Sequence, residues 1–264
     1  MAISELPLLV EGARRLGFNL SERQLDRFRR YYELLVDWNT RINLTAITDP
    51  EGVQVRHFVD SLTVGAALLK EMGQGGGQWY EPPEGFRLID VGTGAGFPGV
   101  PLKILWPQIH LVLNDSIARK TAFLRALVEE LSLEQVEVVP ARAEELGQNR
   151  AHRERYDAAT ARAVASLPVL CEYCLPLVRV GGWMLAPKKG DIAVELEQAG
   201  RASPILGGGP PTLHPFTLPG EAEERYVVAI KKLRPTPPGY PRRVGLPEAR
   251  PPGTGTRGKA NGKG

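Results

Sequence analysis

A glycine-rich loop between an apolar strand and a helix is the feature that most constrains the fold of this chain. In the segment LIDVGTGAGFPGVPLKI the strand runs directly into Gly92, Gly94 and Gly96 and then into a helical pattern. Glycines let the backbone turn sharply and approach a ligand without a Cβ in the way. The dinucleotide fingerprint needs glycine where Phe97 stands, so the loop does not fit a nicotinamide dinucleotide. Asp90, which ends the strand, favours a cationic or polar ligand over a pyrophosphate.

Short β-rich runs alternate with amphipathic helices from this loop onward. We predict strands at 86–92, 110–115, 136–141, 156–161 and 182–187, and helices at 98–106, 117–131, 143–148, 167–178 and 190–202. This alternation is typical of a doubly wound parallel sheet, in which ligands bind beyond the carboxyl ends of the strands. Two last strands, at 213–218 and 225–233, have no helix between them and should form an antiparallel hairpin at the sheet edge.

Helices are predicted ahead of the sheet. From Glu22 to Asn39 apolar side chains recur at helical spacing behind Ser21, which is a suitable N-cap. A second helix is expected from about Pro50 to Met72. We therefore divide the chain into an N-terminal helical region at 1–72, a Gly/Pro-rich loop at 73–85, an α/β domain at 86–234 and a tail at 235–264.

The tail differs sharply in composition from the rest of the chain. It holds six Lys and Arg residues against one acid, a charge of +5, whereas the remaining 234 residues carry −2. It also holds seven Pro and seven Gly and few aliphatic side chains, so we predict that it is disordered. A flexible basic tail beside a nearly neutral body can add salt-sensitive affinity for a phosphate backbone, although it could equally be a solubilising terminus.

The overall composition sets the class of protein. With 42% hydrophobic and 24% charged residues the chain can bury a sizeable core, which excludes collagen, a coiled coil and wholesale disorder. Two cysteines make no disulfide framework, the first ten residues do not resemble a signal peptide, and no apolar run reaches the length of a membrane span. We therefore expect a cytoplasmic protein with no membrane role.

Two further positions indicate a nucleoside site. Asp115 ends the second strand, where an acid can accept hydrogen bonds from both ribose hydroxyls. After the third strand, Ala143 and Glu144 stand where the base of a bound nucleoside would lie. Asp90 or Asp115 alone could be a helix cap or a turn residue, but the glycine loop and the acid at this spacing together favour nucleoside binding.

At this point the sequence resembles the ribosomal RNA small-subunit methyltransferase G family, also called glucose-inhibited division protein B. The resemblance is carried by VRHFVDSL (55–62), DVGTGAGFPGVPL (90–102), NDSIARKTAFL (114–124), ARAEE (141–145), ARAVASL (161–167), PKKG (187–190) and ERYVVAIKK (224–232). These motifs follow in order from about residue 20 to 233. The resemblance implies a class I, Rossmann-like S-adenosylmethionine-dependent methyltransferase with a mostly parallel seven-stranded sheet. It also implies that the enzyme methylates N7 of one guanosine in 16S ribosomal RNA, on naked RNA or on the small subunit.

The resemblance also implies a set of cofactor contacts. They fall on Gly92, Phe97, Asp115, Ser116, Ile117, Ala143, Glu144 and Arg162, to which the loop itself adds Asp90 and Gly94. The spacing of glycines and acids reaches most of these positions without the resemblance. It does not reach Arg162, which follows the fourth strand and could otherwise form a surface ion pair. Phe97 could stack on a base or simply pack in the core.

The implied chemistry needs few catalytic groups. Guanine N7 has a lone pair and no proton, so a methyl group can transfer without a general base if the reacting atoms are aligned. We accordingly predict no acid/base residue and assign positioning roles to Arg56, His57, Asp60 and Arg162, beside Ser61. A clamp between helix and sheet is the alternative role for the residues before the sheet.

Metal and nucleophile sites are not expected. The four histidines are scattered without metal-ligand spacing, so we predict no metal. Cys171 and Cys174 lie three apart on a predicted helix and are expected to be buried, whereas a catalytic cysteine would follow a strand end.

RNA binding is expected to depend on cations near the site and in the tail. The candidates are Arg119, Lys120, Lys188, Lys189, Arg225, Lys231, Arg242, Arg243, Arg250, Arg257, Lys259 and Lys263, with Arg41 and Lys232 as further possibilities. Charged residues at strand ends are otherwise simply solvated. Nothing in the sequence suggests an obligate oligomer, so a monomer is expected.

Three alternatives remain open from the residues. The enzyme could methylate another nucleobase or a small molecule, although an amide-proline motif for exocyclic amino groups is missing after the fourth strand, where ARAVAS stands. The chain could instead be a silent S-adenosylmethionine-binding regulator. A dehydrogenase is disfavoured by Phe97.

Overall fold

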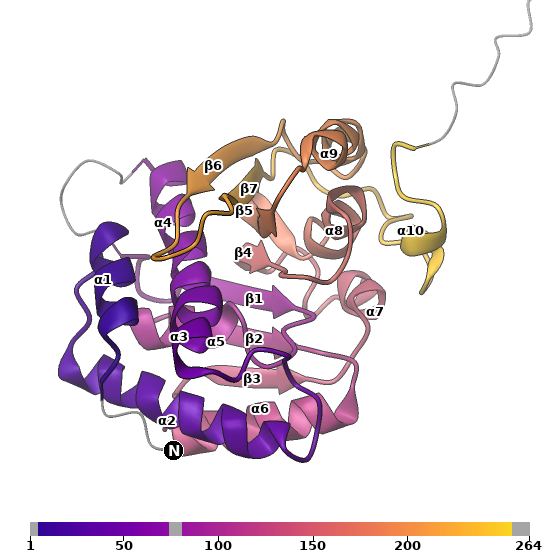
Figure 1. Ribbon diagram of the computed structural model, residues 1–264. Coiled ribbons are helices and arrows are strands. Elements are labelled where there is room, and N and C mark those ends of the chain that lie inside the picture. The colour runs from indigo at the N-terminus through magenta and orange to yellow at the C-terminus, as the bar shows by residue number, and fades with distance from the viewer. Residues whose placement is uncertain (1–4, 74–80, 255–264) are drawn as a thin grey trace, which may run out of the picture.

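The computed structural model describes residues 5–73 and 81–254 and contains one twisted seven-stranded sheet (Figure 1). The strands are β1 (Arg87–Val91), β2 (His110–Asn114), β3 (Val136–Val139), β4 (Tyr156–Thr160), β5 (Val178–Lys189), β6 (Thr212–Phe216) and β7 (Arg225–Lys231). Their order in the sheet is β3-β2-β1-β4-β5-β7-β6. The first five are parallel, and β7 runs antiparallel to both of its neighbours. This topology is that of class I methyltransferases, as predicted.

The strand order reverses direction between β1 and β4. From β1 the chain crosses to β2 and β3 on one side, and it later returns to place β4 and β5 on the other side. The carboxyl ends of β1 and β4 therefore diverge at a topological switch point, where open α/β sheets leave a crevice for a ligand. The glycine-rich loop follows β1 at this crevice.

Helices cover both faces of the sheet. One face carries α4 (Asp60–Glu71), α5 (Gly99–Leu105) and α6 (Ala118–Glu130), with α1 (Pro7–Arg15) and α2 (Glu22–Asn39) packed outside them (Figure 1). The other face carries α7 (Ala143–Gln148), α8 (Leu167–Cys174) and α9 (Ala193–Ile205). The sheet is thus sandwiched between two apolar cores. Among the described residues, no helix combines the length and the hydropathy that crossing a membrane requires.

The predicted cap of α2 is confirmed and also joins the helix to the sheet layer. Ser21 and Gln24 form a reciprocal capping box, in which each side chain accepts from the other residue's backbone N–H. The Gln24 amide also donates to the carbonyl oxygens of Ile104 and Leu105 at the end of α5. Residues far apart in the sequence are therefore tied together at the start of this helix.

The second predicted helix contains a wider turn. It consists of α3 (Pro50–Gly52), a π-helix η1 (Val53–Val59) and α4, which follow one another without a break. π-helical turns are rare and frequent at functional sites. Here the π-helix presents Arg56 and His57 next to Asp60, the first residue of α4, toward the end of β4.

The prediction of disorder from residue 235 onward is wrong for residues 235–254, which wrap across α7 and α8 and form α10 (Leu246–Ala249). Glu172 on α8 is fully buried, and Arg242 binds its carboxylate with two nitrogens, at 2.6 Å for the Nη2–Oε2 pair. Pro241 packs against Gly147 on α7. The composition argument counted aliphatic side chains, whereas proline rings and one buried ion pair hold this segment. Residues 255–264 lie outside the described residues.

Candidate cofactor site and its polar network

The glycine loop is shaped by three left-handed backbone positions. Gly92, Gly94 and Gly96 have φ angles of 65°, 61° and 95°. A Cβ on Gly92 would also lie 2.6 Å from Cγ2 of Val164, which follows β4. Because a side chain fits neither the backbone angle nor the space, glycine at position 92 lets the ends of β1 and β4 approach each other.

Asp90 lies beneath the loop and holds it in shape. Its Oδ2 accepts hydrogen bonds from the Thr93 hydroxyl at 2.5 Å and from the Gly99 backbone N–H at 2.8 Å. The side chain is fully buried, and its Oδ1 has no partner among the described residues. Burial raises the pKa of Asp90 to about 7, more than the two donors lower it. The predicted cofactor residue is therefore placed as a support of the loop.

Asp115 connects the glycine loop to the turn after β2. One carboxylate oxygen accepts from the backbone N–H of Gly94 at 3.0 Å, and the other accepts from that of Ile117 at 2.9 Å. A carboxylate has about four acceptor positions, so lone pairs remain on both oxygens for two further donors. The two backbone donors thereby fix the side chain, with acceptor positions still open on both oxygens.

A cavity of about 210 Å³ lies at the switch point, beside Asp115. It is lined by residues that follow four neighbouring strands and by two residues from elsewhere: Val91, Gly92, Asn114, Asp115, Ser116, Ile117, Lys120, Ala141, Arg142, Ala143, Glu144, Ala163, Val164, Tyr173 and Glu248. Six of the ten predicted cofactor residues are in this lining. Of the other four, Gly94 donates its backbone N–H to Asp115. Asp90, Phe97 and Arg162 are not among the lining residues but lie close to them in the chain.

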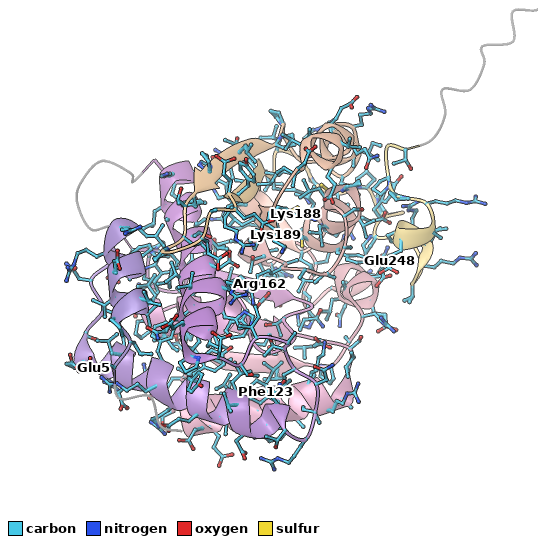
Figure 2. The ribbon with its side chains drawn as sticks, in the orientation of Figure 1. Glu5, Phe123, Arg162, Lys188, Lys189 and Glu248 are labelled. Atoms are coloured by element: carbon cyan, nitrogen blue, oxygen red, sulfur yellow. The ribbon has the colours of Figure 1, made fainter. Side chains whose placement is uncertain are left out.

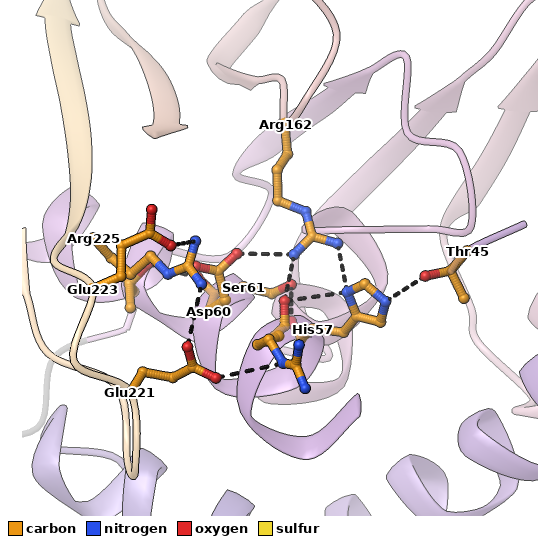
Figure 3. A network of polar contacts seen from close by, with 10 residues as sticks. Thr45, His57, Asp60, Ser61, Arg162, Glu221, Glu223 and Arg225 are labelled. Carbon is orange, nitrogen blue, oxygen red and sulfur yellow. Dashed lines mark hydrogen bonds and ion pairs between the residues drawn. The ribbon is translucent and has the colours of Figure 1, made fainter. Parts of the chain in front are cut away.

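Arg162 is the centre of a polar network between β4 and the helical region (Figure 3). Its Nη1 donates to Asp60 Oδ2 at 2.9 Å and to the Arg56 carbonyl at 3.1 Å, and its Nη2 lies 3.1 Å from His57 Nδ1. The next residue, Ala163, has a left-handed φ of 56° and lines the cavity. The arginine thus joins the predicted positioning residues to the cavity wall.

Both ring nitrogens of His57 are engaged in the network. Nδ1 lies 3.1 Å from Arg162 Nη2 and 3.1 Å from the Arg56 carbonyl oxygen. Nε2 lies 2.8 Å from the Thr45 hydroxyl. Burial, followed by the charge of Arg162, lowers the pKa of His57 to about 3. The ring is therefore neutral and both nitrogens are engaged, so His57 positions its neighbours and is not a proton carrier.

Phe97 packs inside the protein. Its ring stacks on His57 with centroids 4.5 Å apart and on Tyr31 at 5.2 Å, and the Arg162 guanidinium lies 4.9 Å from its centroid. The side chain is 4% exposed. Of the two predicted roles for this ring, the structure favours packing, and the ring supports the Arg162 network from below.

Some predicted RNA-contacting cations lie at an exposed edge beside this network. Arg225 lies near Glu221 and Glu223 (Figure 3), and its side chain is only 11% exposed. Arg56 extends to Glu221, and Lys189 is 65% exposed within 3.7 Å of Glu223. In the sheet Lys189 pairs with Arg225. These cations form one group where β5 ends and β7 begins.

Other predicted cations are engaged inside the protein. Lys188 donates to the Ala165 carbonyl and pairs with Glu195, both at 2.8 Å (Figure 2). Lys232 is fully buried, and Arg242 pairs with Glu172. Lys120 Nζ lies 4.0 Å from Asp115 Oδ2, and Arg41 pairs with Asp37. Four other predicted cations are exposed: Arg119, Lys231, Arg243 and Arg250. Arg257, Lys259 and Lys263, which are also predicted to contact RNA, lie outside the described residues.

The surroundings of the cysteines and acids bear on nucleophilic and metal chemistry. Cys171 and Cys174 are buried on α8, and burial raises the pKa of the Cys171 thiol to about 12. Both cysteines are therefore neutral thiols in the core. In the described part of the chain, no three His, Cys, Asp or Glu side chains gather as a metal site would require.

Comparisons with known proteins support the same family as the sequence motifs and the fold. The family model for rRNA small subunit methyltransferase G matches residues 24–216. A ribosomal RNA small subunit methyltransferase G of Roseiflexus sp. (strain RS-1) is 48% identical over 93% of this chain and 99% of its own length. One from Exiguobacterium sp. (strain ATCC BAA-1283 / AT1b) is 46% identical over 92% of this chain and 97% of its own length.

The chain belongs to the rRNA small subunit methyltransferase G family. It is an S-adenosylmethionine-dependent methyltransferase. Solved structures are more distant from it. An S-adenosylmethionine-dependent O-methyltransferase of Thermotoga maritima has a TM-score of 0.48 and 14% identity, covering 77% of this chain and 73% of its own. A precorrin-6y C5,15-methyltransferase of Geobacter metallireducens has a TM-score of 0.44 and 12% identity, covering 72% and 92%.

The residues that line the cavity suit the ribose and the base of the cofactor of this family. Asp115 has free acceptor positions for a ribose diol, and Gly92 leaves the backbone open where a Cβ would fill the wall. Ile117 is a large apolar side chain that is 40% exposed at the cavity, which suits the face of a base. Sequence reasoning missed Tyr173 and Glu248 in the lining, because no spacing rule connects residues of α8 and α10 to the strand ends. It also missed Val164, which follows β4.

Proposed function

We propose that the chain transfers the methyl group of S-adenosylmethionine to N7 of one guanosine of 16S ribosomal RNA, position 527 in the customary numbering of that RNA. One observation carries the proposal: the cavity at the switch point of a class I sheet is lined by the loop, the acid and the base-side residues at the family's motif positions. The relatives named as small-subunit methyltransferases over nearly their full length support the choice of RNA.

The chemistry requires orientation above all. S-adenosylmethionine supplies an electrophilic methyl group on a positively charged sulfur. Because N7 has a lone pair and no proton, the residues around it need only align the base and exclude water. Arg162, His57 and Asp60 suit this task, since their mutual hydrogen bonds fix them beside the cavity wall. The neutral His57 with both nitrogens engaged fits a positioning role.

We propose a separate role for each group of predicted cofactor contacts. Asp115 would hold the ribose, Ser116 and Ile117 one face of the adenine, and Ala143 with Glu144 its edge. Gly92 and Gly94 would admit the amino-acid end close to the backbone, and Asp90 would hold the loop. The full set of proposed residues is Asp90, Gly92, Gly94, Phe97, Asp115, Ser116, Ile117, Ala143, Glu144 and Arg162, with Phe97 and Arg162 supporting the wall from behind.

RNA is proposed to approach across the exposed cations around the site. Lys189 and Arg56 lie together at one edge beside the largely buried Arg225, and Arg119 with Lys120 opens α6 next to Asp115. Lys231, Arg243, Arg250 and the cations of 255–264 could add further phosphate contacts. Each contact that is removed should reduce the salt slope of binding by about 0.7 to 0.9. We also propose that the protein acts as a monomer, in the cytoplasm, on 16S RNA or the small subunit.

Methyl transfer tests the proposal directly. Labelled S-adenosylmethionine would be incubated with unmethylated small subunits and with their naked RNA, and the modified nucleoside identified by mass spectrometry. We expect 7-methylguanosine at one position, and the preferred form of RNA identifies the substrate. Asp115→Ala should abolish transfer, whereas the exposed Asp26→Asn should not change it. Cofactor binding without labelled RNA in either form would refute the proposal.

A further inference from the structure

The cavity has one wall that comes from the C-terminal segment. Glu248, labelled on α10 in Figure 2, lines the cavity together with the residues that follow the strands. Tyr173 on α8 also lines it, and its hydroxyl donates to Glu248 Oε1 at 3.0 Å. The second carboxylate oxygen of Glu248 thus remains available as an acceptor.

The segment is fastened at a defined end of the cavity. The backbone N–H of Gly245 donates to Glu144 Oε1 at 3.0 Å, and Glu144 is the first acid of α7 after β3. A ribose held by Asp115 at the end of β2 puts the base toward the next strand, which is β3. Glu248 therefore lies at the base end of the site, away from the glycine loop.

The anchoring contacts keep this wall in place. Arg242 is bound to the fully buried Glu172, and the Arg242 Nη2 also donates to the Arg250 carbonyl at 2.7 Å, beyond α10. Burial, and then the neighbouring Glu144, raises the pKa of Tyr173 above its ordinary value, so its hydroxyl keeps the proton that it donates to Glu248. The Glu248 side chain thus has one partner, Tyr173, and the backbone on either side of Glu248 is fastened at Gly245 and at Arg250.

We propose that Glu248 recognises the adenine of S-adenosylmethionine by accepting a hydrogen bond from its exocyclic amino group. A carboxylate accepts and cannot donate, so it distinguishes the amino group of adenine from the carbonyl oxygen that hypoxanthine carries at the same position. The C-terminal segment is then part of the cofactor site. This inference rests on the S-adenosylmethionine dependence of the proposed function.

Binding of cofactor analogues tests it without RNA or catalysis. Affinities of S-adenosylhomocysteine and of its inosine counterpart would be measured by calorimetry for the wild type and for Glu248→Ala. We expect the variant to bind the adenosine form about tenfold more weakly and the inosine form within about twofold of wild type. Glu248→Gln, whose amide can also donate, should bind the inosine form better than Glu248→Ala does.

Three controls separate the possible outcomes. Glu11→Gln, an exposed acid on α1, should leave both affinities unchanged. Tyr173→Phe removes the donor that orients Glu248 and should reduce the preference for adenosine in the same direction. Methylthioadenosine, which lacks the amino-acid end, should lose the same factor as S-adenosylhomocysteine in Glu248→Ala. An unchanged methylthioadenosine affinity would place Glu248 at the amino-acid end and overturn the proposal.

Two other results would also overturn it. An equal loss for the adenosine and inosine forms would mean that Glu248 supports the fold and does not read the base. No change for either form would mean that it does not contact the cofactor. Because these measurements use no RNA, a failure here is distinct from a failure of methyl transfer to 16S RNA.

Discussion

Arg162 Nη2 lies 3.1 Å from His57 Nδ1, and this contact joins the end of β4 to the π-helix of the N-terminal region. The two residues are 105 positions apart in the chain. Burial, and then the charge of Arg162, lowers the pKa of His57 to about 3, so the imidazole is neutral, and its other nitrogen lies 2.8 Å from the Thr45 hydroxyl. The packing of the arginine against the histidine thereby sets the charge and the orientation of the side chains beside the cavity.

Arg162→Lys should reduce methyl transfer strongly. A lysine keeps the charge but cannot bind Asp60 and His57 together in one plane, so the contacts at 2.9 and 3.1 Å would not both survive. We expect a loss of about 2 kcal/mol in the free energy of unfolding and at least tenfold in the transfer rate. Urea denaturation and methyl-transfer assays would measure both. Arg179→Lys, in which the exposed Arg179 pairs with Asp157, is the control. Its free energy of unfolding and its transfer rate should change little.

Acid should destabilise the protein through His57. Its pKa falls from 6.5 to about 3 in the folded chain, so the unfolded chain takes up a proton that the folded chain does not. The contribution to stability is complete above pH 6.5 and is lost as the pH falls toward 3, by at most about 1.4 kcal/mol per pH unit. His57→Gln should show a shallower loss on acidification in urea titrations. Parallel curves for both proteins would contradict this.

Asp90 should change the stability with pH in the opposite direction to His57. Burial raises its pKa from 3.8 to about 7, so its contribution is complete below pH 3.8 and is lost as the pH rises through 7. Asn resembles the protonated acid, so Asp90→Asn should be more stable than wild type at alkaline pH, by about 1 to 2 kcal/mol. Urea melts at two pH values would measure the difference. A variant equally destabilised at both would show that the carboxylate is ionised in the fold.

Gly92→Ala should cost more stability than Gly94→Ala. Both positions have left-handed φ angles, but a Cβ at Gly92 would meet Val164 at 2.6 Å, whereas nothing lies within 4 Å of one at Gly94. We expect each to lose about 1 kcal/mol for the backbone angle, and Gly92→Ala to lose about 1 to 2 kcal/mol more for the contact. Thermal melting would compare them. Adding Val164→Ala should restore part of the loss in Gly92→Ala only.

Arg242→Ala should release the C-terminal segment. Removing the guanidinium leaves the fully buried Glu172 carboxylate without a countercharge and with only the backbone N–H of residue 242 as a donor, which costs about 3 kcal/mol. Limited proteolysis should then cut after residue 235 faster than in wild type, and urea denaturation should show the lower stability. The double variant Arg242→Met with Glu172→Gln should recover much of the loss. A single variant with wild-type resistance would show that this pair does not hold the segment.

The order of strands and helices could be predicted because it depends on local patterns. Apolar runs, breakers and the glycine loop at 92–96 are readable within a few residues of sequence, and the parallel sheet with its final hairpin follows from them. The acids after β1 and β2 could also be located, since the carboxyl ends of parallel strands lie at one edge. Six predicted cofactor residues consequently line the cavity.

The sequence by itself determined which strand ends meet and which side chains stand there. Only the tertiary structure decided the charge of His57, the buried position of Phe97 and the docking of 235–254, because each depends on partners distant in the chain. Composition predicted disorder there, but a buried Glu172 on α8 supplies the partner that Arg242 needs. The energies of ion pairs and of pKa shifts come from burial, and burial is a property of the packed chain rather than of its order of residues.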